Sequence, residues 1–299
     1  STTYANEGGF YACDKIRFRS GFAEKIGGWL RTSAYTFLGV CRSLWNWVTL
    51  GLLNLVGVGT NLKFYIERGG QYNDITPIRD TVSLTNPFTF TNGSTTVTVT
   101  DSAHGAVNGD FVTFSGATIS YLGGNVTAAA LNKEFQITYV NANTYTITIG
   151  VTPNSTDASN SPAGGTVSAA YQINTGPATA TPVTGWGAGS WGSGTWGVGV
   201  TNYDPLRLWS QVNFGEDLIF GPRGGGIYYW DATGGVGVRA VNLTTLGGAS
   251  DVPTVQNYIF VSDVSRFVFA FGCNDYGSAV QDPMLIRWSD QESAVNWTP

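Results

Sequence analysis

Acidic residues and one histidine are the side chains of this sequence that could take part in acid–base chemistry. Glu216, Asp217 and Asp231 lie close together in the chain, and glycoside hydrolysis needs two carboxylates placed on either side of one bond. Their spacing alone does not bring two of them to one bond, and the same holds for a second acidic set: Asp263, Asp290 and Glu292. We therefore expect no catalytic residues and no enzymatic activity.

The remaining reactive residue types do not form a recognisable site either. His104 is in a turn-rich stretch without a nearby cysteine, which favours a packing role in a turn or loop over a role as a base. The glycines 224–226 precede an apolar, strand-like run and not a helix, so they predict a hairpin turn and not a phosphate site. Cys13, Cys41 and Cys273 are odd in number and far apart, which indicates neither a disulfide framework nor a zinc site. No cofactor and no metal are expected.

The composition favours a fold made of strands. The 299 residues include 40 glycines and many Thr, Val and aromatic residues, which are typical of strands joined by tight turns. The best helix candidate, residues 128–135, is short. A net charge of −5, from 20 acidic and 15 basic residues, argues against a protein that binds nucleic acid by charge.

One uncharged stretch has the length of a membrane-spanning helix. No charged residue occurs between Arg42 and Lys63, and a span needs about 20 apolar residues. Residues 43–49 are strand-like, however, and Gly51 and Asn54 interrupt the apolar run after them, so we expect strands here and no membrane span.

Strand patterns that recur along the chain predict its architecture. Residues 55–77 contain an apolar strand, a turn at 60–61, an aromatic strand, a glycine turn and a closing strand. Looser copies of the pattern occupy residues 217–241 and 267–299. Because a lone hairpin cannot bury its apolar face, repeated units of this kind stack against one another. The pattern predicts an all-β fold with a partial β-propeller of repeated antiparallel blades.

The number of blades is too small for a closed ring. A closed propeller uses about four to eight blades, whereas three partial copies are present and the last reaches Pro299. We expect either that more sequence follows in the natural protein or that another chain completes the blades.

A second domain interrupts the repeats. Between residues 80 and 175 the composition shifts to Thr, Asn, Ser and Ala, and alternating apolar residues predict a small β-sandwich or barrel with one apolar face. The expected strands are residues 95–100, 110–114, 135–140, 145–149 and 166–173. The predicted domains are a lead-in with the first blade at 1–79, the insert at 80–175, and a linker with further blades at 176–299.

Two segments outside the repeats are candidates for binding. Lys15, Arg17 and Arg19 alternate with Ile16 and Phe18, the period of a half-buried strand. The cations form either a solvated face or a contact with an acidic partner or with passing DNA.

Three tryptophans mark a glycine-rich linker. Trp186, Trp191 and Trp196 recur every five residues, and the glycines between them let the chain lay the rings on an apolar surface. Tryptophan rings can also form a platform for glycans, which is the functional alternative for this linker.

The chain resembles the tail hub or nozzle proteins of short-tailed bacteriophages, whose body is a β-propeller. The segments that carry the resemblance are residues 14–19 with 27–29, 56–60 with 72–77, the Trp-Gly linker, and 287–290 with 296–299. They cover most of the chain outside the insert. The insert, with residues 103–105 and 109–114, looks like a small β-module also found in phage tail proteins.

The resemblance implies a structural function in the virion tail, with assembly in the host cytoplasm. Six copies would form a tube below the portal and adaptor that retains packaged DNA, conducts it without specific binding and meets the host envelope. An acidic tube would repel phosphates and let DNA slide. The alternatives are a carbohydrate- or receptor-binding tail module and a glycan-degrading propeller enzyme.

Overall fold

The protein is built almost entirely of antiparallel strands. The computed structural model describes residues 14–28, 33–118, 124–155, 163–176 and 206–298. Within these ranges six small sheets form, with one short α-helix, α1 (Ala128–Leu131). The all-β prediction is confirmed, and the helix occupies only the first half of the predicted segment.

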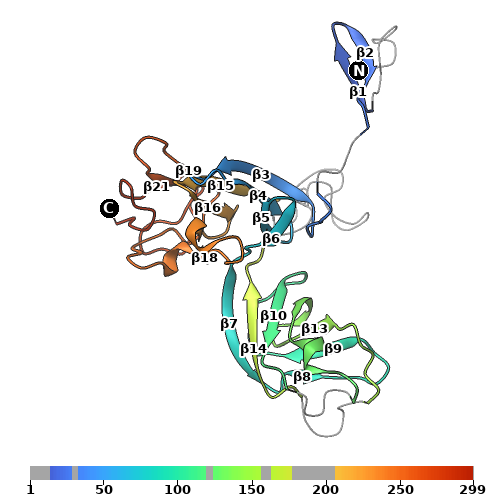
Figure 1. The fold of residues 1–299 in the computed structure, drawn as a ribbon. Helices are drawn as coiled ribbons and strands as arrows, with labels where there is room; N and C mark the ends of the chain where they lie inside the picture. The colour runs from blue at the N-terminus through green and yellow to red at the C-terminus, as the bar shows by residue number, and fades with distance from the viewer. Residues whose placement is uncertain (1–13, 29–32, 119–123, 156–162, 177–205, 299) are drawn as a thin grey trace, which may run out of the picture.

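Three of the sheets are meanders that correspond to the three sequence repeats (Figure 1). The first sheet contains β3 (Cys41–Val48), β4 (Asn54–Thr60), β5 (Phe64–Arg68) and β6 (Gln71–Asp74). The second sheet contains β15 (Trp209–Phe214), β16 (Asp217–Pro222), β17 (Tyr228–Trp230) and β18 (Val241–Asn242). The third sheet contains β19 (Tyr258–Val261), β20 (Val268–Phe271) and β21 (Ile286–Trp288).

The structure differs from the predicted repeats at their first and last strands. Strands β15 and β19, the first strands of the second and third sheets, were not predicted. The closing strand predicted at residues 296–299 is wrong, because Asn296 makes only one isolated bridge, to Ser250. Trp297 is buried there and donates its indole N–H to the Ala294 carbonyl at 2.8 Å. Packing of this ring and two backbone hydrogen bonds with Ser250 hold the segment, which forms no strand.

The three meanders are stacked face to face, an arrangement called here the fan. Strand β15 lies between β3 and β19 (Figure 1), so the first strands of all three sheets are neighbours, as the inner strands of propeller blades are. Trp45 of β3 donates to Asn213 of β15 at 2.5 Å, and Ile259 of β19 donates its backbone N–H to Ser210 of β15 at 3.2 Å. The described residues form no closed ring.

Alternating glycine and valine in β4 explain how closely the first two sheets approach. Gly57 and Gly59 face the second sheet, and a Cβ atom on Gly59 would lie 2.5 Å from Cδ1 of Trp209. Beside this contact the rings of Phe64 and Phe220 stack at 4.0 Å. Glycine is needed at these positions because the neighbouring sheet occupies the space that a side chain would take.

The insert is a sandwich of two four-stranded sheets. Their strand orders are β11-β10-β14-β7 and β12-β13-β9-β8. The strands are β7 (Ile78–Thr85), β8 (Phe88–Thr89), β9 (Thr96–Thr100), β10 (Phe111–Ser115), β11 (Glu134–Gln136), β12 (Thr138–Asn141), β13 (Thr144–Thr148) and β14 (Thr166–Gln172). The single strand predicted at 135–140 is in fact two strands, β11 and β12, which belong to different sheets.

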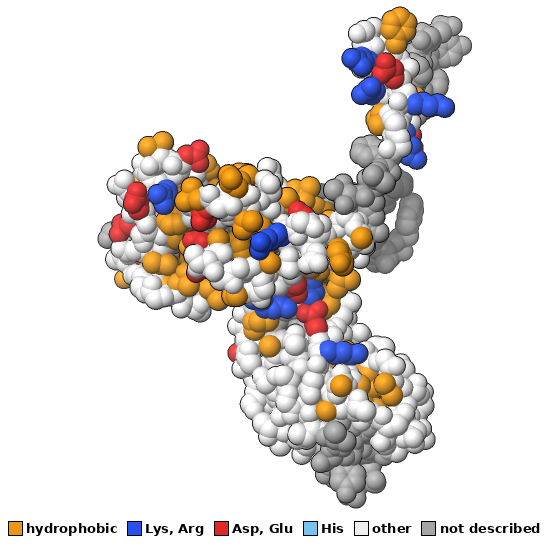
Figure 2. Space-filling model, in the orientation of Figure 1, with side chains coloured by type: hydrophobic (Ala, Val, Ile, Leu, Met, Phe, Trp, Pro, Cys, Tyr) orange, Lys and Arg blue, Asp and Glu red, His pale blue; other side chains and the backbone are white. Residues whose placement is uncertain are grey.

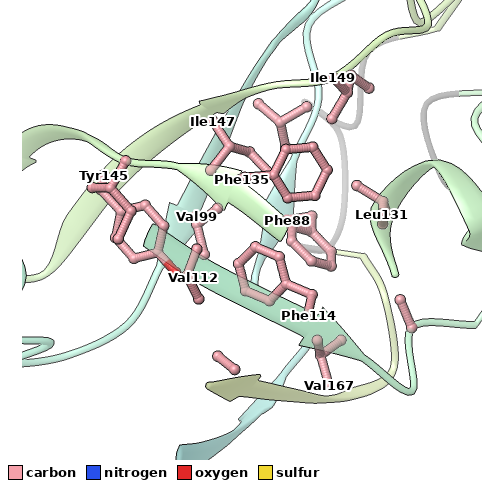
Figure 3. Close-up of a cluster of buried hydrophobic side chains, with 14 of the residues drawn as sticks. Phe88, Val99, Val112, Phe114, Leu131, Phe135, Tyr145, Ile147, Ile149 and Val167 are labelled. Atoms are coloured by element: carbon pink, nitrogen blue, oxygen red, sulfur yellow. The ribbon is translucent and has the colours of Figure 1, made fainter. Parts of the chain in front are cut away.

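One contiguous core fills the sandwich (Figure 3). Phe114 is at its centre, with its ring centroid 5.1 Å from Phe88 and 6.1 Å from Phe135. Threonines alternate with buried valines in β9, so the threonines point outward and Val97 and Val99 point into the core. The two sheets thus bury their apolar faces against each other.

The amino-terminal part forms a separate hairpin of β1 (Ile16–Arg19) and β2 (Phe22–Lys25), which lies apart from the fan (Figure 1). No helix among the described ranges is long and apolar enough to cross a membrane. The uncharged stretch between Arg42 and Lys63 forms most of β3 and all of β4.

Candidate functional site

The carboxylates that could have formed a hydrolytic pair instead hold strand ends. Asp217 accepts hydrogen bonds from the Tyr229 hydroxyl and from the Ala232 backbone N–H, the latter at 2.8 Å. Asp231 accepts from Thr233 at 2.7 Å at the start of a short 3-10 turn, and the Thr233 hydroxyl lowers the pKa of this carboxyl. Glu216 accepts from the backbone N–H of Leu50. Each carboxylate therefore has a local structural partner.

His104 is buried in the insert and both ring nitrogens are hydrogen-bonded. Its Nε2 lies 2.9 Å from the Asn141 carbonyl, and its Nδ1 accepts from the Ala106 backbone N–H at 3.0 Å. The ring also contacts Tyr145 edge to face, with centroids 5.0 Å apart. These contacts agree with the predicted packing role. Among the described residues no group of three or more His, Cys, Asp and Glu side chains could hold a metal ion.

A group of charges around one buried lysine joins the fan to the insert. Lys63, at the start of β5, donates to Asp74 at 2.7 Å and also to Glu134 of the insert. Arg239, from the loop before β18, contacts the same two carboxylates at 3.1 and 3.5 Å. We call these four residues the junction network; red and blue side chains mark this region in Figure 2.

Burial and charge act in opposite directions on Asp74. Burial raises the pKa of its carboxyl, but the positive charges of Arg239 and Lys63 outweigh this, so the pKa lies below its ordinary value. The side chain of Lys63 is only 4% exposed, and a buried charge is tolerated only when it is paired. The network therefore holds the two domains together through paired charges.

Sequence reasoning missed the junction network because its members are remote in the chain. The only local signal was a lysine, Lys63, next to the buried Phe64 in an otherwise apolar stretch. Periodicity within one strand carries no information about Glu134 or Arg239.

The three predicted contact cations lie on the amino-terminal hairpin. Arg17 pairs with Glu24 across the hairpin at 3.1 Å, and Arg17 and Arg19 are exposed. Lys15 lies just before β1 with a positive φ of 56°, so it is not part of the strand as predicted. On the apolar face of the strand, Ile16 is partly buried and Phe18 is 56% exposed. The hairpin thus presents both charge and apolar surface.

The predicted tryptophan platform lies outside the described residues: Trp186, Trp191 and Trp196.

The outer face of the third sheet is the most aromatic exposed surface of the described chain. Odd and even positions of each strand face opposite sides, and Ile259, Val268 and Ala270 face the second sheet in a buried cluster. The opposite side, called here the trailing face, consists of Tyr258, Phe260, Phe269, Phe271, Ile286 and Trp288. Trp288 is 58% exposed.

The outer face of the first sheet is the other end of the fan. It is called here the leading face and includes Leu44, Val56, Val58, Tyr65 and Tyr72. Residues 33–40 cover part of it, with the ring of Phe37 5.0 Å from that of Tyr72. A groove of about 950 Å³ remains beside this segment, lined by Leu44, Val56 and other residues. Leu44 is 65% exposed.

Comparison with known proteins gives distant structural similarity alone. No known family and no curated protein matches the sequence. A solved structure of the phage phi92 endosialidase is similar at 16% identity and a TM-score of 0.27. The match covers 84% of this chain and 36% of that chain, so the chain spans about a third of the length of that protein. This similarity is too distant to assign a function.

Proposed function

We propose that this chain is a structural subunit of the tail of a short-tailed bacteriophage, in an oligomeric tube that retains DNA and conducts it during ejection. The observation that carries the proposal is the fan, in which three stacked meanders leave an apolar face at least partly exposed at each end. Contiguous exposed apolar surface of this kind marks interaction sites. Such a subunit functions through contacts with other chains and has no catalytic activity of its own.

The segments that resemble tail nozzle proteins occupy structural positions in the fold. Residues 56–60 lie in β4, at the close contact with the second sheet, and residues 72–77 close the first sheet and lead into the insert. Arg287 of β21 donates to the carbonyls of Asn274, Asp251 and Trp297. These motifs serve packing, which suits a scaffold better than an enzyme.

The finer parts of the proposal follow from the resemblance. They are six copies in the tube, contacts with the portal, the adaptor and other tail proteins, and an approach to the host envelope. A net charge of −5 is compatible with DNA that passes without specific binding, because like charges repel. The carbohydrate- or receptor-binding alternative would use the tryptophan linker or the insert.

Labelled phage particles test the proposal. A short epitope inserted after Gly277, a turn residue with open space around it, should label the tail in electron micrographs of particles from the phage that encodes the chain. Label on the capsid, or chain absent from purified particles, would contradict the proposal.

The exposed hairpin offers a second test. Changing both Arg17 and Arg19 to Glu should reduce incorporation into particles several-fold if the hairpin contacts an acidic partner, without changing the unfolding midpoint. The Lys133→Glu variant, which changes an exposed lysine of the insert, is the matched control. Normal incorporation of the double variant would mean that the two arginines of the hairpin make no contact that assembly needs.

A further inference from the structure

The two ends of the fan have complementary positions in a repeating stack. Inside the chain, the first sheet turns one face to the second, and the second turns its opposite face to the third. In the first and second sheets, the face equivalent to the trailing face is covered by the next sheet. In the second and third sheets, the face equivalent to the leading face is covered by the preceding sheet.

The internal contacts indicate what kind of surface would cover the trailing face. Where the first and second sheets meet, aromatic rings from both sides interlock, with Phe64 5.0 Å from Trp209 and 4.0 Å from Phe220. The trailing face has the same character, since Phe269 lies 6.0 Å from Phe260 and 6.5 Å from Trp288. An apolar sheet face is therefore the matching partner.

We propose that the trailing face of one copy of this chain docks on the leading face of a second copy. The contact continues the internal stacking across the boundary between two chains, and the same contact can form twice about a shared axis. Two copies then contribute six sheets, which is within the range of about four to eight that closed propellers use. This inference deepens the proposed function and rests on it only in treating the chain as a subunit; three such pairs would supply the six copies of the proposed tube.

The leading face has room for this contact on its inner strands. Residues 33–40 lie over β5 and β6, where the Leu38 backbone N–H donates to the Tyr65 hydroxyl at 3.2 Å. The groove beside them opens onto β3 and β4, and β3 is one of the inner strands of the fan. Leu44 on β3 and Val56 on β4 therefore remain for the second copy.

The oligomeric mass of purified chain tests the contact. Sedimentation equilibrium should give twice the 31.8 kDa of one chain. The variants Trp288→Glu, on the trailing face, and Leu44→Glu, on the leading face, should each give single chains, because a charge at an apolar contact is not paired there. Both residues are largely exposed in one copy, so unchanged circular dichroism would demonstrate that the variants fold. Val140→Glu, at a 53% exposed position in β12 of the insert, should stay dimeric.

Mixing the two variants separates this contact from other ways of pairing. A Trp288→Glu copy keeps an intact leading face and a Leu44→Glu copy keeps an intact trailing face, so the mixture should contain dimers with one intact contact. Three results would overturn the inference. The unaltered protein could be monomeric, the Leu44→Glu variant could still dimerise through two trailing faces, or the mixture of variants could stay monomeric. If the epitope does not label the tail but the variants and their mixture dimerise as expected, only the assignment to a phage tail is contradicted.

Discussion

The insert and the fan are both made of small antiparallel sheets, but they differ in what their sheets leave uncovered. In the insert two sheets bury their apolar faces against each other around one core. Its large exposed hydrophobic side chains within the described ranges are only Val107, Tyr139 and Val140. In the fan the middle sheet is covered on both sides, while the two outer sheets each have an apolar face that is exposed at least in part. Figure 2 shows hydrophobic side chains gathered over the fan and a largely neutral polar surface on the insert.

The difference indicates separate roles for the two regions. A two-sheet sandwich is complete once its two faces meet, whereas a stack of sheets always has two ends. We infer that the insert folds around its own core and that the fan is the part that assembles. Three substitutions and one change of pH test whether the insert and the fan have separate cores and how they are joined.

Truncation of the insert core should have the largest effect. Phe114 is 1% exposed, and replacing a buried Phe with Ala costs about 3 to 5 kcal/mol. Because no tryptophan lies between residues 78 and 173, tryptophan fluorescence reports only on the chain outside the insert, whereas hydrogen exchange follows both regions. Phe114→Ala should therefore speed exchange in the insert with little change in tryptophan fluorescence. Val140→Ala, at an exposed position, is the control, and equal loss in both regions would contradict separate cores.

Removal of the cation at the junction should have the next largest effect. Lys63→Met leaves Arg239 as the one cation that contacts Asp74 and Glu134 in the junction network. Loss of one partner of a buried ion pair should cost about 3 kcal/mol, the low end of the usual range, because both carboxylates are partly exposed. Urea unfolding measures the loss, and Lys133→Met, an exposed lysine, should change stability by less than about 1 kcal/mol. Equal effects of the two changes would mean that the network does not hold the domains together.

A methyl group at the closest sheet contact should separate the first two sheets. Gly59→Ala places a Cβ atom 2.5 Å from Trp209, and overpacking of this kind costs about 2 kcal/mol. The midpoint of the tryptophan fluorescence transition should fall, while Gly247→Ala, which meets nothing within 4 Å, should leave it unchanged. An unaltered midpoint for Gly59→Ala would mean that the sheets are not tightly packed.

The smallest expected effect is a dependence on pH at the junction. The pKa of Asp74 is lower in the folded protein than its ordinary value of 3.8, so the unfolded chain takes up the proton first as the pH falls. Stability from Asp74, which faces Lys63, Arg239 and Glu134, is thus complete above that value and is lost as the pH drops through the folded pKa. The stability difference between the unaltered protein and Asp74→Asn should shrink below pH 3.8; a constant difference would contradict the assigned pKa shift.

Local sequence patterns predicted the repeats but not how the chain segments meet. The Val-Gly alternation at residues 56–59 and the hairpin turn at 224–226 are confirmed because they depend on neighbours in the chain. Strand β7 could not be predicted because Arg79 and Asp80 interrupt its apolar pattern. Residues 135–140 have the pattern of one strand because the alternation continues where the chain passes from one sheet to the other.

Long-range contacts account for the rest of what was missed. The junction network joins residues 63, 74, 134 and 239, and only the folded chain brings them together. The exposed trailing face was also not predicted, since an alternating apolar strand has the same pattern whether or not another sheet covers it.

An electron cryo-microscopy map of the assembled particle tests the central claim most directly, namely that the fan is continued by a second copy. The map should place the first sheet of one copy over Phe260 and Trp288 of the next, with the insert projecting from the ring. A map in which both end faces of the fan contact only solvent would contradict the account.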